Sequence, residues 1–595
     1  MKKVIIFGVD GLTMPLLRRF CDEGILPAIK KMFDAGAATE LLPFISAWGD
    51  VNWVTFMSGQ CPGKSWIGQG MPPDNMSSNN LLALLEKAGL RAALMHFPET
   101  VSVGGTSHFE MAPYWGRPAP FELCPAAIHR AAQEDRVGRK KQQKLGWPPA
   151  AALAYHEKDN RRRMLPIADG YLMEIAKGIT AKVSVLNKLG KREFSVEINK
   201  HSTPLHPSVW SDWLMISDEM ASAKVRFCLV QDSDDGEVEI LQSQVMKPEA
   251  LANDRSLGLA LCEKIGPFIA KWTAKVSPDE PLSSSAIDEA EYQSLWLADC
   301  ALELTKNHGF SLWATVHRLV DESHHNCLGM YDPESPFYDS GKAEKYGEVI
   351  RECYKVLDRT IGRIMEKMDE KTILMLASDH GAVPNSYMCD INRYLAEAGL
   401  VTLSDEGRVI REKSRVFLKD ERGGLEIFVN LAGREVGGIV APEDYDSVCE
   451  EVQHALGRMH VVKNGKVLNA ISMALKKSDA VGIGYWGQYA GDVIFAYNTG
   501  FVWGVSAKGE TICPVESPGA NHGPQKPTAR TETASNYGVF LTYGHGIRKG
   551  YLRDIDRDGP YRMVDPAATI AHLFGVKSRT LDGVVMHDFM EDRAP

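Results

Sequence analysis

The sequence predicts an α/β fold in which a doubly wound, mostly parallel sheet is flanked by helices and carries inserted cap regions. Three continuous apolar runs, at residues 4–9, 312–316 and 372–377, are each followed by a polar cluster. A run of this kind suits a parallel strand that is covered on both faces. A shorter run of the same character, at 539–541, leads into a glycine-rich turn. Strands that alternate with helical stretches are typical of a doubly wound sheet.

The stretches between these runs divide the chain into a core and two insertions. Residues 16–33 show the apolar periodicity of an amphipathic helix. Residues 115–290 break the alternation with basic runs and with a period-two stretch at 181–198, which predicts antiparallel strands. Residues 400–500 are again mixed and glycine-rich. We therefore expect a core at 1–115, 290–400 and 500–595, an inserted cap or lid at 115–290, and a second insertion at 400–500.

The composition is that of an ordinary globular protein with an acidic balance. Of the 595 residues, 44% are hydrophobic and 24% are charged, and the formal net charge is −10. This balance argues against nucleic acid or an anionic membrane as a partner. It still leaves room for a local cationic pocket that binds a small anionic substrate, because metal ions do not appear in that sum.

The cysteines and the N-terminal segment favour a cytoplasmic location. The eleven cysteines are scattered and contain no C-x-x-C pair, which suits neither a disulfide framework nor a thiolate zinc site. The apolar run at 4–9 is too short for a signal peptide, and no stretch approaches the length of a membrane span. We expect a protein of the reducing cytoplasm with no membrane partner.

Polar residues follow two of the predicted strands. Asp10 comes directly after the run at 4–9, and Asp379 and His380 follow the run at 372–377. Ligands of open α/β sheets bind beyond the carboxyl ends of the strands, which is where these side chains fall. Asp379 and His380 can reach one ion from a turn at a strand end. Asp is also a favoured helix N-cap, and this is the alternative for Asp10.

Two further clusters supply an acid and two histidines. Asp321 and His325 lie four residues apart in VDESHHNCLGMYD (320–332), so that on a helical turn they share one face and can hold one cation. His522 lies in the loop SPGANHGPQ (517–525). Taken singly, such residues are commonly solvated. Together, the three acids and three imidazoles divide into two oxygen/nitrogen sites that suit zinc, manganese or iron.

The order and contexts of these six residues resemble the alkaline-phosphatase superfamily, in particular its type I phosphodiesterase/nucleotide pyrophosphatase branch. The resemblance covers the expected core and reaches the C-terminal part, through GVFLTYGHGIRKG, VDPAATIAHLFGV and LDGVVM. It implies two divalent ions, zinc first with manganese or iron as alternatives, which lie about 4 Å apart and clamp the oxygens of an in-line displacement at phosphorus. By position, one ion would be held by Asp321, His325 and His522, and the other by Asp10, Asp379 and His380.

The chain departs from this family at the nucleophile. The family places a Thr or Ser about ten residues before the glycine of a TG or SG dipeptide. Anchored on Ser58-Gly59, that position is Gly49, which has no side chain to attack with. Three alternatives stay open: Ser46 attacks, Asp50 acts as a ligand or a carboxylate nucleophile, or a metal-bound hydroxide attacks directly. The last is favoured, with Asp50 helping to orient the metal-bound species.

These residues predict a metal-dependent hydrolase that acts on a small phosphodiester, a nucleotide or a phosphonate. The basic runs at 136–144 and 161–163 could contact an anionic substrate tail, although such runs are more often solvated helix faces. Two other functions compete: a two-metal hydrolase or lyase that acts on a non-phosphoester bond, and a non-catalytic member of the family that binds metal. The missing nucleophile favours the non-catalytic alternative, and the presence of all six ligands argues against it.

Overall fold

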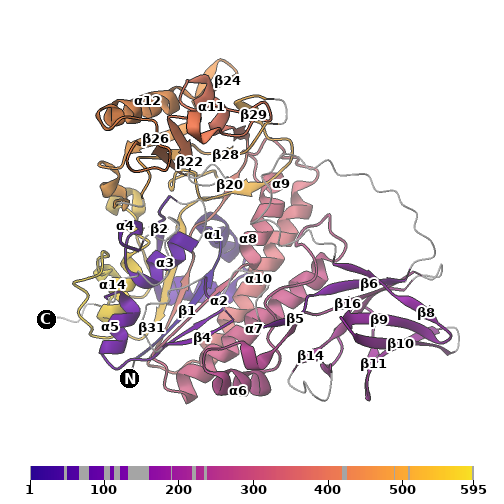
Figure 1. The fold of residues 1–595 in the computed structure, drawn as a ribbon. Coiled ribbons are helices and arrows are strands. Elements are labelled where there is room, and N and C mark those ends of the chain that lie inside the picture. The colour runs from indigo at the N-terminus through magenta and orange to yellow at the C-terminus, as the bar shows by residue number, and fades with distance from the viewer. Residues whose placement is uncertain are drawn as a thin grey trace.

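The structure is a computed structural model in which a central α/β body carries two peripheral units (Figure 1). One unit lies at the top of the view and contains helix α12, and the other extends to the right and contains strands β8 to β11. The structure describes residues 2–45, 50–65, 79–98, 108–112, 121–131, 160–188, 191–216, 223–232, 237–418, 425–487, 490–506 and 509–591.

A nine-stranded sheet forms the centre of the body, in the order β32-β2-β31-β19-β1-β18-β3-β4 with β33 beside β2. Strand β1 is parallel to both of its neighbours, and the parallel set continues through β3 and β4. The predicted α/β fold with a mostly parallel sheet is therefore confirmed. The strands are β1 (Lys3–Val9), β2 (Gly36–Leu42), β3 (Ala92–Met95), β4 (Phe109–Met111), β18 (Leu312–His317), β19 (Thr372–Ala377), β31 (Gly538–Gly544), β32 (Tyr551–Leu552) and β33 (Tyr561–Arg562).

The apolar run of β1 is covered on both faces of the sheet, as its unbroken pattern predicts. Ile5 and Phe7 lie in one hydrophobic cluster, and Val4 and Ile6 lie in another. The first cluster packs against α1 (Met14–Asp22), α2 (Pro27–Ala35), α7 (Ser283–Asn307) and α10 (Ala343–Lys367). The second packs against α3 (Asp50–Ser58), α5 (Leu81–Lys87) and α14 (Asp565–Leu573).

Two elements differ from the prediction. The run at 539–541 lies in β31, which is antiparallel to both β19 and β2 and does not extend the parallel set. An apolar run reports that both faces are buried, but it carries no information on strand direction. The prediction of one helix over 16–33 is also wrong: the chain turns at Gly24, with a φ of 77°, and Pro27 begins a second helix.

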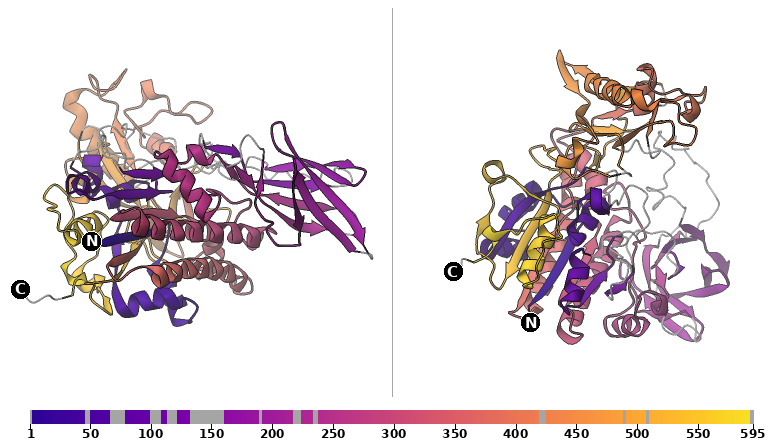
Figure 2. Two further views of the ribbon diagram at one scale, coloured as in Figure 1. Left: turned by 90° about the horizontal axis from the view of Figure 1, so that it is seen from below. Right: turned by 60° about the vertical axis from the view of Figure 1, so that its left-hand side comes forward.

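The first insertion is built largely from antiparallel sheet that stands off the body (Figure 2). The predicted antiparallel strands at 181–198 are β10 and β11. The segment after this unit, with α6 (Arg255–Ile265), packs on the body instead, through Leu261 and Phe268. The strands of the two larger sheets are β6 (Ala127–Ala131), β7 (Arg161–Arg163), β8 (Leu165–Ile167), β9 (Gly170–Ala176), β10 (Ile179–Lys188), β11 (Lys191–Ile198), β12 (His201–Leu205), β15 (Phe227–Asp232) and β16 (Val238–Gln242).

The second peripheral unit combines a four-stranded antiparallel sheet with helix α12 (Tyr445–Arg458), which share one hydrophobic cluster. The cluster includes Leu395 and Phe501, so it draws on residues on both sides of the expected 400–500 range. The elements of this unit are β21 (Tyr387–Cys389), α11 (Ile391–Glu397), β22 (Val416–Leu418), β23 (Glu426–Val429), β24 (His460–Lys463), β25 (Lys466–Asn469), β26 (Ile471–Lys476), β27 (Val493–Tyr497) and β28 (Phe501–Trp503).

Candidate metal centre

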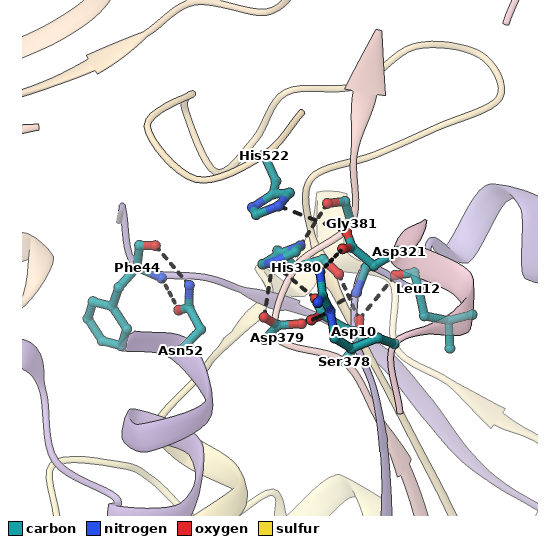
Figure 3. A network of polar contacts seen from close by, with 12 residues as sticks. Asp10, Leu12, Phe44, Asn52, Asp321, Ser378, Asp379, His380, Gly381 and His522 are labelled. Carbon is teal, nitrogen blue, oxygen red and sulfur yellow. Dashed lines mark hydrogen bonds and ion pairs between the residues drawn. The ribbon is translucent and has the colours of Figure 1, made fainter. Parts of the chain in front are cut away.

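Two buried acids emerge at the carboxyl ends of neighbouring central strands. Asp10 follows β1 and Asp379 follows β19, and the parallel register brings both strands to one edge of the sheet. Asp10 is 2% exposed and Asp379 is 0% exposed. The capping alternative for Asp10 is wrong, because the N-cap of α1 is Thr13. Both carboxylates therefore face the crevice rather than a helix end (Figure 3).

The pair Asp321 and His325 lies on successive turns of one helical segment. Asp321 belongs to α8 (Leu319–Ser323), and His325 belongs to the π-helical turn His324–Leu328 that continues it. His325 Nε2 lies 3.3 Å from Asp321 Oδ2. His325 Nδ1 is 2.8 Å from the Ala520 carbonyl oxygen, and since a carbonyl only accepts, Nδ1 is the protonated nitrogen. This bond leaves Nε2 directed at the carboxylates, an orientation typical of a ligating histidine.

His380 and His522 are stacked against each other at the same edge. Their ring centroids lie 3.6 Å apart with an interplanar angle of 11°. His380 Nδ1 donates to the Gly381 carbonyl at 2.9 Å, so that Nε2 faces Asp379 at 3.0 Å and Asp10 at 3.4 Å. The loop that carries His522 reaches the sheet because β30 (Ala520–Asn521) pairs with β20 (Val383–Pro384), which begins three residues after His380.

These side chains form two overlapping groups that could each hold an ion. Asp10, Asp379 and His380 offer ligand atoms that all lie within 4.8 Å of one another, as do Asp321, His380 and His522. The first group has the composition expected from the family resemblance. The second contains His380 in the place expected for His325, although His325 stays in contact with Asp321.

Burial and neighbouring charges set the pKa values of the acids in this cluster. Burial raises the pKa of Asp10 well above its usual range, and the negative charges of Asp379 and Asp321 raise it further. Burial also raises the pKa of Asp321, but the contact with His325 outweighs it and holds that pKa well below its usual range. Burial lowers the pKa of His380, whereas Asp379 and Asp10 raise it, to about 10. The acids thus need positive charge close by, which is the role of a bound cation.

The donor atoms fit such a cation. Asp321 Oδ1, Asp379 Oδ2 and His380 Nε2 are buried and make no hydrogen bond in the described part of the chain, and the last two are in contact only with each other and with Asp10, as ion pairs. Buried polar atoms are nearly always paired, so unpaired ones in a single cluster indicate an ion or water. Carboxylate oxygens and imidazole nitrogens together suit zinc, manganese or iron.

The expected nucleophile positions fall mostly outside the described residues. Ser46 and Gly49 lie in the undescribed segment 46–49, and the side chain of Asp50, at the start of α3, is likewise outside the description. Asn52 of α3 accepts from the Phe44 amide at 2.7 Å and donates to its carbonyl at 3.1 Å. These two hydrogen bonds join Phe44, after β2, to the first turn of α3 (Figure 3).

Arg318 is a residue of the site that the sequence reasoning missed. It directly follows β18, just as Asp10 follows β1, and its guanidinium lies 3.7 Å from Asp10 Oδ2 and 3.7 Å from Asp321 Oδ2. The signal was available, because a charged residue directly after a buried strand marks the same edge of the sheet.

The basic runs of the first insertion are only partly described. Residues 136–144 lie outside the described ranges. Residues 161–163 form strand β7, and not the helix face considered from the sequence. Arg162 of this strand donates to the Ile175 carbonyl at 2.6 Å and to the Glu174 carbonyl at 3.0 Å. Arg162 therefore supports the sheet of the insertion.

Comparison with protein-family models identifies a family for this chain. A family model described as type I phosphodiesterase/nucleotide pyrophosphatase matches residues 189–525, which is more than half of the chain. No curated protein sequence matches.

Solved structures are similar at low identity. Murine ectonucleotide pyrophosphatase/phosphodiesterase 5 is 11% identical with a TM-score of 0.44, over 99% of this chain and 100% of that one. Phosphonoacetate hydrolase from Sinorhizobium meliloti 1021, in complex with phosphonoformate, is 11% identical with a TM-score of 0.46, over 97% and 96%. A mutant of the alkaline phosphatase PafA is 11% identical with a TM-score of 0.45, over 99% of each chain.

The chain is a phosphoester hydrolase of the alkaline-phosphatase superfamily. Within that superfamily it belongs to the type I phosphodiesterase/nucleotide pyrophosphatase family. Within the described ranges, no helix combines the length and apolar character needed to cross a bilayer.

Proposed function

We propose that the protein is a two-metal hydrolase that acts on a small phosphodiester, a nucleotide or a phosphonate. The observation that carries the proposal is the pair of overlapping three-ligand groups, buried at the carboxyl edge of the sheet in a member of this family. The similar structures include a nucleotide pyrophosphatase/phosphodiesterase and a phosphonoacetate hydrolase, which supports this range of substrates.

Six residues would hold the two ions, with zinc as the first choice and manganese or iron as alternatives. Asp10, Asp379 and His380 would hold one ion, and Asp321, His522 and His325 the other, with His380 close to both groups. When bound, two such ions activate the attacking oxygen and stabilise the charge on the leaving group in a displacement at phosphorus.

The chain's own residues prepare the site for these ions. The carbonyls of Ala520 and Gly381 fix the tautomers of His325 and His380, so that each ring presents Nε2 to the carboxylates. Because Asp379 is fully buried, its attraction for a bound cation is weakly screened by solvent. The side chains are therefore oriented and largely removed from solvent before any substrate binds.

The attacking group is proposed to be hydroxide from solvent, oriented by Asp50, with Ser46 as the side-chain alternative. The absence of a hydroxyl at Gly49 supports this order of preference. We expect turnover of bis-p-nitrophenyl phosphate to survive Ser46→Ala and to fall in Asp50→Ala. Loss of turnover in Ser46→Ala with retention in Asp50→Ala would contradict direct hydroxide attack.

The function itself is tested by metal analysis with a substrate panel. We expect about two zinc, manganese or iron ions per chain and turnover of at least one of p-nitrophenyl phosphate, its diester and a p-nitrophenyl phosphonate. Asp379→Asn should lose metal and activity together. The matched control is Asp446→Asn, whose side chain is 82% exposed, and it should retain both. Fewer than one ion per chain, or full metal with no turnover of any of these esters, would refute the proposal.

The cysteines support a reducing compartment. All eleven are free in the structure, and ten of them are buried, so their thiols contribute to the core rather than to cross-links. We therefore keep a cytoplasmic location as part of the proposal. Thiol titration of the freshly isolated, unfolded protein tests it, since recovery of fewer than eleven free thiols would indicate an oxidising compartment.

A further inference from the structure

A cavity of about 410 Å³ lies in the second peripheral unit, lined by the β24–β25 hairpin, by strand β21 and by the turn before β28 (Figure 1). Its volume falls in the roughly 300–1,000 Å³ range of small-molecule sites. Among the described residues that line this cavity there is none of the predicted metal ligands. The cavity is therefore a candidate binding site apart from the metal centre.

Backbone hydrogen bonds hold the walls of the cavity in place. The amides of Ser386 and Tyr387 both donate to the Gly500 carbonyl, at 2.7 and 3.0 Å, and join the start of β21 to the turn before β28. The Asn498 amide donates to the Ala470 carbonyl at 2.8 Å and joins that turn to the residue after β25. The cavity is therefore formed before any ligand enters it.

The charge in the lining of the cavity is positive. Lys463 of β24 is exposed and makes no ion pair or hydrogen bond within the described part of the chain. Its cross-strand partner Lys466 does not line the cavity. The described lining residues include no acid. Because an ammonium group binds phosphate and carboxylate as a point charge, the cavity favours an anion.

Much of the remaining lining is aromatic or aliphatic. Tyr387 and Phe501 stack, with ring centroids 5.1 Å apart and an interplanar angle of 21°. Val467 and Leu468 of β25 add aliphatic surface, and Val467 is 61% exposed, so a ligand would cover apolar surface that now faces water. A flat ring suits such a wall, because aromatic side chains pack well against planar groups.

Three further polar side chains line the cavity without taking part in the hydrogen bonds of the fold. The Ser386 and Thr499 hydroxyls and the Asn469 amide group make no hydrogen bond to another described residue. Hydroxyl and amide groups both donate and accept, so together they match the hydroxyls of a sugar.

We propose that this cavity binds a small organic anion with a planar ring, of the class of the nucleoside monophosphates, at a site separate from the metal centre. Lys463 pairs with the phosphate, the stacked rings and the aliphatic side chains contact the base, and the hydroxyl and amide groups contact the sugar. The inference goes beyond the proposed function, because no metal ligand takes part in it.

The test is calorimetric titration of Asp379→Asn with adenosine monophosphate, because this variant should lose the ions and with them binding at the metal centre. We expect about one molecule bound per chain. Adding Lys463→Met should raise the dissociation constant about tenfold, because a charge-assisted contact is lost. The matched control Lys466→Met removes the same charge from the opposite strand and should leave the constant unchanged. Ribose 5-phosphate, which has no base, should bind about tenfold more weakly than adenosine monophosphate.

A new charge on the apolar wall gives a second comparison. Val467→Glu places a carboxylate in the lining and should abolish binding of adenosine monophosphate by repulsion. Its matched control is Val462→Glu, because Val462 is the cross-strand partner of Val467, is 64% exposed and does not line the cavity. No binding to Asp379→Asn, or equal affinities within either matched pair, would overturn the inference.

Turnover distinguishes a separate site from an extension of the substrate site. The cavity adjoins the loop of His522, since Tyr497, next to Asn498, donates its amide to the Pro524 carbonyl at 2.9 Å. With Asp379 intact and zinc bound, we expect kcat/KM for bis-p-nitrophenyl phosphate to be the same in Lys463→Met and Lys466→Met. A fall in Lys463→Met alone would overturn the separation of the two sites. Wild-type protein with less than one ion per chain would refute the proposed function and leave this inference standing.

Discussion

Glu289 of α7 is a buried acid whose ionisation should control stability near the site. It is 0% exposed, and its Oε2 accepts from the Thr273 amide at 2.6 Å and from the Thr273 hydroxyl. Burial raises its pKa from 4.5 to about 7, against the opposing effects of the Thr273 bonds and of Arg226. The contact ties α7 to the segment before it, and the next residue, Ala290, contacts His317 through its carbonyl.

The size of this effect on stability follows from the difference between the pKa of Glu289 in the folded and in the unfolded protein. Because the folded pKa lies above the unfolded one, the folded state binds the proton more tightly. The stabilisation is complete below pH 4.5, is lost as the pH rises toward 7, and stays lost above that. The shift corresponds to about 3 kcal/mol of unfolding free energy. Glu289→Gln removes this loss, and it weakens a hydrogen bond by about 1 kcal/mol. At about pH 8 the variant should therefore be more stable by roughly 2 kcal/mol.

The assay is urea unfolding at about pH 5 and about pH 8, together with hydrogen exchange in α7. We expect Glu289→Gln to be more stable than the wild type at the higher pH and slightly less stable at the lower one. Glu291→Gln, on the same helix but paired with Arg359 at the surface, should show the same small change at both. If Glu289→Gln is destabilised equally at both pH values, burial does not govern this carboxyl group and the reasoning is refuted.

Three further predictions concern the site and the buried histidines. His522→Ala should lower the zinc content from about two ions to about one per chain by atomic emission, and an unchanged content would exclude it as a ligand. Gly11→Ala should lower the unfolding temperature and the zinc content together, because φ is 72° and the new carbon would lie 2.9 Å from Asp321 Oδ1; a variant equal to the wild type in both would contradict this. His96 and His317 have folded pKa values of about 3 and about 4, below the usual 6.5, so the stability they contribute above pH 6.5 should be lost as the pH falls. Replacement by Gln should flatten the acid limb of the stability curve by up to about 5 kcal/mol at His96 and up to about 3 kcal/mol at His317, and an unchanged limb would refute it.

Several features of the site could be predicted because their causes are local. Asp10 and Asp379 were placed at one edge because each follows an unbroken apolar run, and such a run is a strand buried on both faces. Asp321 and His325 were placed on one face by their spacing of four residues. The stacking of His522 on His380 had no such signal, because it depends on a strand pairing between 383–384 and 520–521.

The sequence by itself determined the α/β class, the mostly parallel sheet and the strand ends at which charged residues gather. Each of these follows from hydrophobic periodicity, which is a property of residues close together in the chain. Only the tertiary structure decided that β31 runs antiparallel, that His380 is shared by both ligand groups, and that Arg318 lies between Asp10 and Asp321. Each of these depends on the packing and register of segments far apart in the chain. Contacts of that kind arise only when the core closes, and no local pattern specifies them.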